Sequence, residues 1–304
     1  MKAVVYRQYG GPEVLEYVDL PDPKLSHNGV VVRIKTAALN PADVGLQAGV
    51  GEGFMDTWFP VIPGWDLAGV IEQVGVGVTE FAVGDRVMGY VHHEILHHGA
   101  YAEKANVPVE LLVHKPAVLA WETAAALPLA GLTALRAIDQ ALADRTAETI
   151  LIHGASGGVG CLAAQLALSR GVRVLGAASP AHHPYLRSLG IEPIERGEGL
   201  AERVSLMAPE GISAILDCAG RGALAYSAPL VRTDVRVVSI ADSGPGIKSV
   251  FARADATALA KLVEQVATGL LKVPIAAIYP LARAAEAQEA LSASHAPGKI
   301  VLVI

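Results

Sequence analysis

The chain has 304 residues, of which 52% are apolar and 18% are charged, a composition typical of a globular protein and not of a disordered one. Single hydrophobic cores stop growing near about 250 to 300 residues, so this length predicts about two domains. Asp and Glu number 30 against 24 Lys and Arg, the formal net charge is −6, and no run of basic residues occurs. The charge therefore argues against nucleic acid or an anionic membrane as a partner.

The apolar stretches and the cysteines bear on location and chemistry. Residues 1–7 lack the apolar run of a signal peptide, and no segment approaches about 18 uninterrupted apolar residues. The two cysteines, Cys161 and Cys218, are too few for a disulfide scaffold and lack the paired spacing of a zinc site. We expect a cytoplasmic protein in which both cysteines pack as small hydrophobes and a cofactor carries any redox chemistry.

The sequence shows two successive patterns of predicted helices and strands. Up to about residue 116, short β-rich runs between Gly and Pro predict a largely antiparallel β domain, with strands at residues 2–6, 30–37, 67–74, 86–90 and 100–105. Near Trp121 the pattern changes to Ala-rich helical segments alternating with strands, which is typical of a doubly wound parallel sheet. These strands are expected at residues 149–153, 172–177, 214–217 and 235–240. Helices at 254–271 and 284–292 and a strand at 299–304 should then return to the first domain.

A glycine-rich turn follows the strand expected at residues 149–153 and leads directly into a helix pattern. Glycines let the backbone approach a pyrophosphate, and the N–H groups and positive dipole end of the first helical turn stabilise its charge. The spacing departs from the common GxGxxG, but the flanking strand and helix favour a dinucleotide site over a turn without ligand. The expected cofactor-binding residues here are Gly154, Ala155, Ser156, Gly157, Gly158, Val159 and Gly160.

The end of the next strand indicates which dinucleotide binds. NAD-selective folds carry an acidic residue about 20 positions beyond the loop, where it accepts hydrogen bonds from the ribose 2′-hydroxyl. Residues 176–183 contain no carboxylate. Ser179 can donate to a 2′-phosphate, and His182, His183 and Arg196 can add positive charge. The sequence therefore predicts NADPH, the alternative being that Ser179 and Pro180 only form a turn beside solvated histidines.

Motifs spread over nearly the whole chain match one family. They are MKAV at 1–4, NPAD at 40–43, PGWDLAGV at 63–70, VGDRV at 83–87, LPLAGLTA at 127–134, the glycine loop, and GKIVL at 298–302. By these motifs the chain resembles the zinc-independent quinone oxidoreductase, or zeta-crystallin-like, branch of the medium-chain dehydrogenase/reductase superfamily. The resemblance implies an α/β fold with a GroES-like β-rich catalytic domain at 1–117, completed by 250–304, and a Rossmann NADP(H)-binding domain of doubly wound parallel sheet at 118–249. It also implies an active site in the cleft between them and a homodimer.

Zinc alcohol dehydrogenases of this superfamily bind their catalytic metal through a Cys in the NPAD-like motif and a His-Glu pair in the PGWD-like motif. This chain has Asn40 and Trp65-Asp66 at those positions, and an amide and an indole do not supply the thiolate and imidazole that zinc prefers. The four-cysteine structural zinc lobe is also missing, because the chain has two cysteines in total. We expect no metal in the reaction.

Residues 93–97 spell the HExxH motif of zinc peptidases, and His92 and His98 flank it. A peptidase site requires this segment on a helix, so that both histidines share one face. Here the segment lies between a predicted strand and Gly99, which leaves room for little more than a loop. We interpret it as a His-rich connecting loop near the mouth of the cleft, with an adventitious metal site left open.

The resemblance also implies which residues meet the nicotinamide. Asn40 and Thr133 are the expected catalytic residues, with a strand-end cap for Asn40 and a backbone-bonded hydroxyl for Thr133 as structural alternatives. Two loops after later strands are expected along the nicotinamide half of the cofactor, through Cys218, Ala219, Ser239 and Ala241.

The sequence thus predicts an NADPH-dependent oxidoreductase that reduces quinones or α,β-unsaturated carbonyls by hydride transfer. Both classes accept hydride at a carbon conjugated to a carbonyl, and the sequence does not choose between them. The alternative is a nucleotide-binding structural or regulatory protein without turnover.

Overall fold

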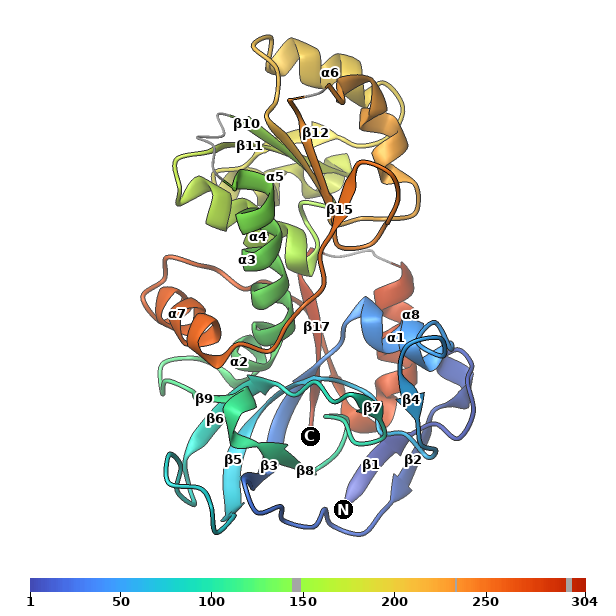
Figure 1. The fold of residues 1–304 in the computed structure, drawn as a ribbon, viewed down its shortest axis with the longest axis vertical. Coiled ribbons are helices and arrows are strands. Elements are labelled where there is room, and N and C mark those ends of the chain that lie inside the picture. The colour runs from blue at the N-terminus through green and yellow to red at the C-terminus, as the bar shows by residue number, and fades with distance from the viewer. Residues whose placement is uncertain (144–148, 233, 294–296) are drawn as a thin grey trace. The chain divides into compact units, whose positions relative to one another are not determined.

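The computed structural model describes residues 1–143, 149–232, 234–293 and 297–304 (Figure 1). The chain forms two compact units, Met1–Leu129 with Ala254–Ile304, and Ala130–Arg253. The sequence predicted domain boundaries after residues 117 and 249, whereas the boundaries between the two units follow Leu129 and Arg253. The α/β architecture, with one β-rich unit and one parallel-sheet unit, is confirmed.

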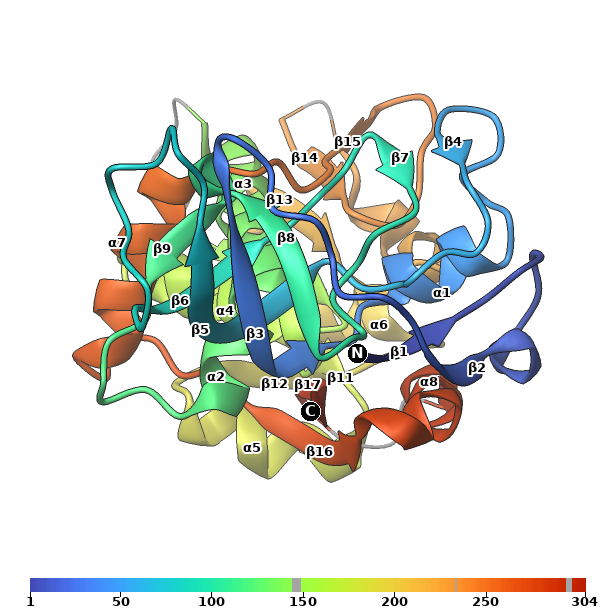
Figure 2. The same cartoon turned by 90° about the horizontal axis from the view of Figure 1, so that it is seen from below.

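The first unit is built on a seven-stranded sheet of β3 (Gly29–Ala38), β5 (Asp66–Val74), β6 (Arg86–Tyr90), β8 (Lys104–Pro108), β9 (Leu112–His114), β16 (Ile275–Pro280) and β17 (Lys299–Val303). The strand order is β16-β17-β3-β5-β6-β9, and β8 also pairs with β3. Figure 2 shows β3, β5, β6, β8 and β9 as neighbours. Because β17 pairs with β3, the C-terminal segment completes the sheet that the N-terminal segment begins.

β3 lies between β17 and β5 in the interior of the sheet, and its side chains suit a buried strand. Val30, Val31, Val32 and Ile34 are at most 2% exposed, and β-branched residues fit the pleated surface of a sheet. The rest of the unit comprises β1 (Lys2–Val5), β2 (Glu16–Asp19), β4 (Asp56–Thr57), β7 (Ile95–Leu96), α1 (Pro41–Gln47), α2 (Trp121–Ala126), α7 (Ala256–Ala267), α8 (Ala284–Ala293) and the short 3₁₀ helices η1 (Pro12–Val14), η2 (Val109–Leu111) and η5 (Leu281–Arg283).

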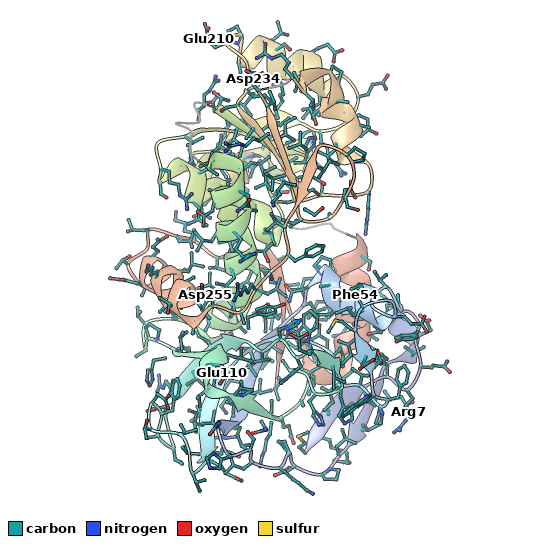
Figure 3. The ribbon with its side chains drawn as sticks, viewed as in Figure 1. Arg7, Phe54, Glu110, Glu210, Asp234 and Asp255 are labelled. Atoms are coloured by element: carbon teal, nitrogen blue, oxygen red, sulfur yellow. The ribbon has the colours of Figure 1, made fainter. Side chains whose placement is uncertain are left out.

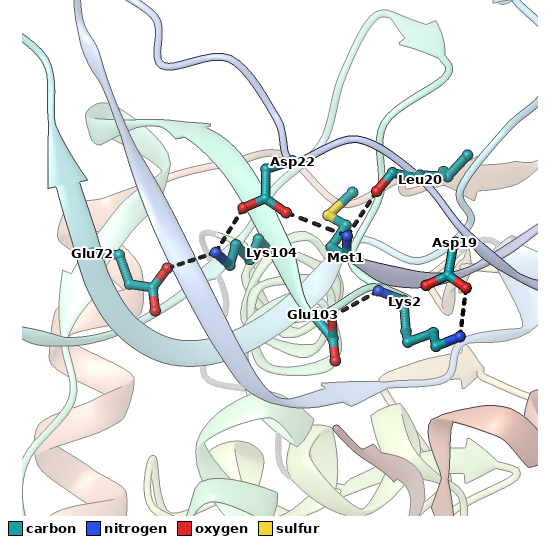
Figure 4. A network of polar contacts seen from close by, with 8 residues as sticks. All are labelled: Met1, Lys2, Asp19, Leu20, Asp22, Glu72, Glu103 and Lys104. Atoms are coloured by element: carbon teal, nitrogen blue, oxygen red, sulfur yellow. Dashed lines mark hydrogen bonds and ion pairs between the residues drawn. The ribbon is translucent and has the colours of Figure 1, made fainter.

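Polar contacts fix the N-terminus of the first unit (Figure 4). The Met1 amino group donates to the carbonyl oxygen of Leu20 at 2.7 Å and lies 3.3 Å from Asp22. Lys104 on β8 pairs with Asp22 at 2.7 Å and with Glu72 on β5 at 3.2 Å. Exposed ion pairs contribute about 0 to 1 kcal/mol each. The buried apolar side chains of β1 therefore contribute more to holding this strand in place.

The second unit is a six-stranded parallel sheet of β10 (Thr149–His153), β11 (Arg173–Ala178), β12 (Glu192–Glu195), β13 (Ala214–Asp217), β14 (Arg236–Ser239) and β15 (Ile247–Ser249). The order β12-β11-β10-β13-β14-β15 is that of a Rossmann fold. Its helices are α4 (Gly158–Leu168), α5 (His183–Ser188), α6 (Leu200–Met207) and the 3₁₀ helices η3 (Pro180–His182) and η4 (Ala223–Leu230), while α3 (Pro128–Leu142) leads into the unit.

Some expected elements shift at their ends. The strand expected at 100–105 is wrong over residues 100–103, because the ladder starts at Lys104 and Ala102 forms only an isolated bridge with Ala3. The helix expected from residue 254 begins at Ala256, since Asp255 caps it by accepting from the backbone N–H of Ala258 at 2.9 Å (Asp255 is labelled in Figure 3). No helix in the described part of the chain is long and apolar enough to cross a membrane.

Candidate active site

The glycine loop forms a tight turn at the carboxyl end of β10. Gly154 has φ of +66°, in the left-handed region that favours glycine. The N–H of Gly157 donates to the carbonyl oxygen of Gly154 at 2.9 Å, and α4 begins at Gly158. A Cβ at Gly160 would overlap the Gly154 carbonyl, so only glycine lets the helix pack this close to the turn.

This turn has the geometry of an anion site. The first N–H groups of an α-helix have no acceptor within the helix, and they carry the positive end of its dipole. β10 lies where the strand order reverses, between β11 and β13, which is where dinucleotides bind in doubly wound sheets. The residues of the expected loop therefore fit the pyrophosphate of a dinucleotide.

Residues expected at the 2′-phosphate gather at the ends of β10, β11 and β12. Ser156 Oγ lies 2.9 Å from His182 Nδ1, which joins the glycine loop to the turn after β11. The backbone carbonyl oxygen of Ser179 accepts from the backbone N–H of His182 at 2.9 Å, and the backbone N–H of Arg196 donates to the Ala178 carbonyl oxygen at 3.1 Å. The sequence did not single out Glu195, an exposed carboxylate on β12 in register with Ala178.

The two loops expected at the nicotinamide also lie at this edge of the sheet. A Cβ on Gly154 would be 3.1 Å from the carbonyl group of Cys218, so the loop after β13 packs against the glycine loop. Ala219 and Ala241 are exposed, whereas Ser239 is fully buried. Burial raises the pKa of the Cys218 thiol, which keeps it protonated at neutral pH and unsuited to nucleophilic attack.

A buried polar cluster forms in the first unit around the start of α1. Asn40 Nδ2 donates to Asp66 Oδ2 at 2.9 Å, and Lys299 Nζ donates to Asn40 Oδ1. Asp43 Oδ2 accepts from the backbone N–H of Asn40 at 2.9 Å and from the Tyr101 hydroxyl at 3.0 Å. All five residues are at most 5% exposed. The cluster is therefore held together by hydrogen bonds away from solvent.

Burial dominates the electrostatics of this cluster. It raises the pKa of Asp43 to about 7, although hydrogen bonds from Asn40 and Tyr101 oppose the change. It raises the pKa of Asp66 to about 6, although the Lys299 ammonium and hydrogen bonds from Asn40 and the backbone N–H of Leu129 oppose it. Lys299 Nζ lies 3.9 Å from Asp66, so the cluster carries its own cation.

The donor set of the cluster does not fit zinc. Asn40 and Asp66, which stand at the superfamily's metal-ligand positions, are bonded to each other, and Lys299 places an ammonium beside both. They offer neither thiolate nor imidazole. Across the residues that the structure describes, no group of three or more His, Cys, Asp or Glu side chains is arranged to hold a metal.

The histidine-rich segment at residues 92–98 is a loop with one two-residue strand, β7, paired with β4. The His97 and His98 rings lie 3.9 Å apart, and the His92 ring packs 4.7 Å from Trp65. Burial lowers the pKa of His92, His93 and His98. The helix that a zinc peptidase requires is not formed by this segment.

Thr133, the second expected catalytic residue, lies on α3 and is 5% exposed. It belongs to the second unit, whereas Asn40 belongs to the first. Both residues are buried, since Asn40 is 2% exposed.

Comparison with known proteins identifies the family. Residues 26–117 match the alcohol dehydrogenase GroES-like domain, and residues 198–302 match the family described as zinc-binding dehydrogenase. The chloroplast envelope quinone oxidoreductase homolog of Arabidopsis thaliana is 32% identical, over 99% of this chain and 98% of its own. This chain belongs to the quinone oxidoreductase branch of the medium-chain dehydrogenase/reductase superfamily.

Other members of the superfamily are similar along the whole chain. The 2-methylene-furan-3-one reductase of Solanum lycopersicum is 31% identical over 99% of this chain and 79% of its own. A solved NAD-dependent alcohol dehydrogenase has a TM-score of 0.91 and 29% identity, with both chains fully covered. The mycobacterial protein Rv1454c in complex with NADPH has a TM-score of 0.87 and 26% identity, also with full coverage of both. The family and the fold expected from the sequence are thus confirmed.

Proposed function

We propose that this chain is an NADPH-dependent oxidoreductase that reduces quinones or α,β-unsaturated carbonyl compounds by hydride transfer without zinc. The observation that carries the proposal is the carboxyl end of β10 and β11, where the glycine loop meets a turn that is free of carboxylates and its Ser156 contacts His182. The quinone oxidoreductase and furanone reductase names of the relatives support the acceptor classes.

Cofactor choice follows from charge at the end of β11. We propose that Ser179, His182 and Arg196 bind the 2′-phosphate and that the backbone from Ala155 to Gly160 binds the pyrophosphate. The NADPH complex of the mycobacterial neighbour supports this choice. Because another neighbour is an NAD-dependent alcohol dehydrogenase, the two cofactors must be compared directly. Calorimetric titration should give a clearly lower Kd for NADPH, and equal or tighter binding of NADH would contradict the proposal.

The chemistry asks little of the protein beyond orientation and charge stabilisation. NADPH, when bound, supplies the hydride for a carbon conjugated to a carbonyl group. Negative charge then develops on the carbonyl oxygen, where hydrogen-bond donors lower the barrier. We propose Asn40 and Thr133 as the residues of the nicotinamide end. An amide nitrogen carries two N–H groups, and Asn40 gives one of them to Asp66. The contacts with Asp66 and Lys299 fix the amide's orientation, and we propose that its second N–H donates to the acceptor oxygen.

An acceptor panel tests the function. Purified protein with NADPH should reduce a 1,4-quinone or a small enone, and the reaction is followed by the loss of NADPH absorbance. The relative rates then separate quinone from enone preference. NADPH binding without turnover of any acceptor would instead favour a nucleotide-binding structural or regulatory protein.

We also propose that the protein is a homodimer, as the family resemblance implies, and that it works in the cytoplasm. The name of the Arabidopsis relative places that protein at the chloroplast envelope, so location varies within the family. Light scattering should give twice the mass of the 31.5 kDa chain. A mass equal to one chain would contradict the dimer.

A further inference from the structure

Three buried polar residues lie in register across neighbouring strands of the second unit. His153 on β10 is paired with Asp217 on β13, and Asp217 is paired with Ser239 on β14. Each is the last residue of its strand, and none is more than 2% exposed. Buried polar groups destabilise a fold unless they are hydrogen-bonded, so the partners of this row show what it holds.

The carboxyl group of Asp217 binds the loops that follow two strands. Its Oδ1 accepts from the backbone N–H groups of Ala219 and Gly220, both at 2.9 Å. Its Oδ2 accepts from the Ser239 hydroxyl at 2.8 Å. Ser239 Oγ in turn accepts from the backbone N–H groups of Ala241 at 3.0 Å and Asp242 at 2.8 Å. One carboxyl group and one hydroxyl thus fix four backbone N–H groups.

The two loops also pack against each other and against the glycine loop. A Cβ on Gly154 would lie 3.2 Å from the Cβ of Ala219, and a Cβ on Gly220 would lie 2.7 Å from the Cβ of Ala241. Close-packed interiors transmit displacements, so movement of one loop shifts the next. Asp217 therefore lies under a continuous surface that starts at the pyrophosphate turn.

The direction of a bound dinucleotide follows from this surface. With its pyrophosphate at the turn after β10, its 2′-phosphate end lies toward Ser179 and His182 after β11. The other half must then extend over the strands on the opposite side, β13 and β14. Exposed Ala219 and Ala241 lie on that side, while Asp217 and Ser239 are buried beneath them.

We propose that Asp217 and Ser239 are positioning residues that hold these loops in place for the nicotinamide half of NADPH. The inference rests on the proposed function, because it assumes a bound dinucleotide. Ser239, which the sequence suggested as a cofactor contact, acts through the backbone of Ala241 and Asp242. Asp217, which was not among the residues expected to contact the cofactor, acts through Ala219 and Gly220.

Two variants disrupt the bond between Asp217 and Ser239 and, in one of them, the bonds from Ser239 to the second loop. Ser239→Ala deletes the acceptor of the Ala241 and Asp242 N–H groups. Asp217→Asn turns an amide nitrogen toward Ser239 Oγ, which already accepts two hydrogen bonds, and the serine hydroxyl loses its acceptor. The matched control is Ser213→Ala. Ser213 Oγ donates to the Thr149 carbonyl oxygen at 2.9 Å, at the amino ends of β10 and β13 and therefore away from the two loops.

The readout is calorimetric binding of two ligands, NADPH and 2′-phospho-ADP-ribose, which keeps the pyrophosphate and 2′-phosphate but lacks the nicotinamide. Ser239→Ala and Asp217→Asn should weaken NADPH binding about tenfold and leave the Kd of 2′-phospho-ADP-ribose within about twofold. Ser213→Ala should change neither. Circular dichroism checks folding, and Ser239→Ala carries the test alone if Asp217→Asn does not fold.

Two results would overturn the inference. Equal weakening of both ligands would show a general loosening of the unit, and unchanged NADPH binding in both variants would show that the loops need no such support. A wild-type protein that binds neither ligand would refute the proposed function itself, which is a different outcome from either.

Discussion

The side chain of Asn40 connects two charged groups, since Nδ2 donates to Asp66 and Oδ1 accepts from Lys299. Loss of a hydrogen bond to a buried charge costs about 1.5 to 3 kcal/mol of stability, and loss of a donor to a developing oxyanion costs about 10² to 10³ in rate. Asn40→Ala should therefore lower both the unfolding midpoint and the turnover, with NADPH binding changed much less. Kinetics, calorimetry and denaturation measure the three effects.

Gln47→Ala is the control for Asn40→Ala, because Gln47 is another buried amide on α1 that bonds Gly11 and Gln288. It should lose stability and keep its turnover per folded molecule. Unchanged turnover in Asn40→Ala would remove Asn40 from the catalytic residues.

Ser179 tests the charge at the end of β11. A carboxylate there repels a 2′-phosphate and can accept from a 2′-hydroxyl, so Ser179→Asp should raise the Kd of NADPH and lower that of NADH. Ser188→Asp adds the same charge at the far end of α5 and serves as the control. The ratio of the two Kd values is the measurement, and an unchanged ratio in Ser179→Asp would place the 2′-phosphate elsewhere.

The raised pKa of Asp43 predicts that the free energy of unfolding decreases as the pH rises. Its pKa is about 7 in the folded chain and near 3.9 in an unfolded one, so the folded state binds this proton more tightly. The stability that this proton gives is complete below about pH 4 and is lost as the pH rises through about 7. Asp43→Asn should therefore reduce the fall in unfolding free energy between about pH 5 and about pH 8. Denaturant titration at both pH values measures it, with exposed Asp56→Asn as control; an unreduced fall would contradict the assignment.

At the scale of elements, the glycine turn combines a left-handed residue with a close contact. Gly154→Ala places a Cβ 3.1 Å from the Cys218 carbonyl at a φ of +66°, whereas Gly171→Ala meets nothing within 4 Å at a φ of +76°. Backbone strain costs each variant about 1 to 2 kcal/mol. Only Gly154→Ala should also weaken NADPH binding, by about tenfold or more, because it displaces the loop after β13. Equal NADPH affinity in the two variants would show that the turn does not bind the cofactor.

The sequence predicted the buried parallel strands well and the edge strands poorly. β10 and β13 appeared at their observed bounds, because both are apolar runs that end at a polar residue. β2, β12 and β15 have three or four partly exposed residues each and gave no such pattern. The Ser156–His182 contact and the row from His153 to Ser239 depend on register between strands far apart in sequence. A polar residue at or near the carboxyl end of three of the four predicted strands, His153, Asp217 and Ser239, was the signal that the sequence offered for this row.

At the scale of the whole molecule, motifs rather than composition indicated the family and the roles of a catalytic and a cofactor-binding domain. Length indicated two domains, composition indicated that they are globular, and the glycine loop indicated a dinucleotide. Asn40 and Asp66 stand at the metal-ligand positions of the family motifs, so the residue types alone argue against zinc, and the hydrogen bond between the two side chains agrees with this. Burial of the cluster, its pKa values and the place of Lys299 required the fold, because β17 brings Lys299 beside a residue 259 positions earlier in the chain.

The most direct test of the account is NADPH consumption with a 1,4-quinone before and after dialysis against a strong chelator. Alcohol oxidation needs the hydroxyl proton removed, which zinc assists by lowering its pKa, whereas a conjugated acceptor is already electrophilic. The bonded Asn40, Asp66 and Lys299 offer zinc neither thiolate nor imidazole. If hydride transfer needs no zinc, quinone reduction should proceed at the same rate in both samples, with simple alcohols oxidised far more slowly. Turnover that is lost on dialysis and restored by zinc, or alcohol oxidation at a comparable rate, would contradict it.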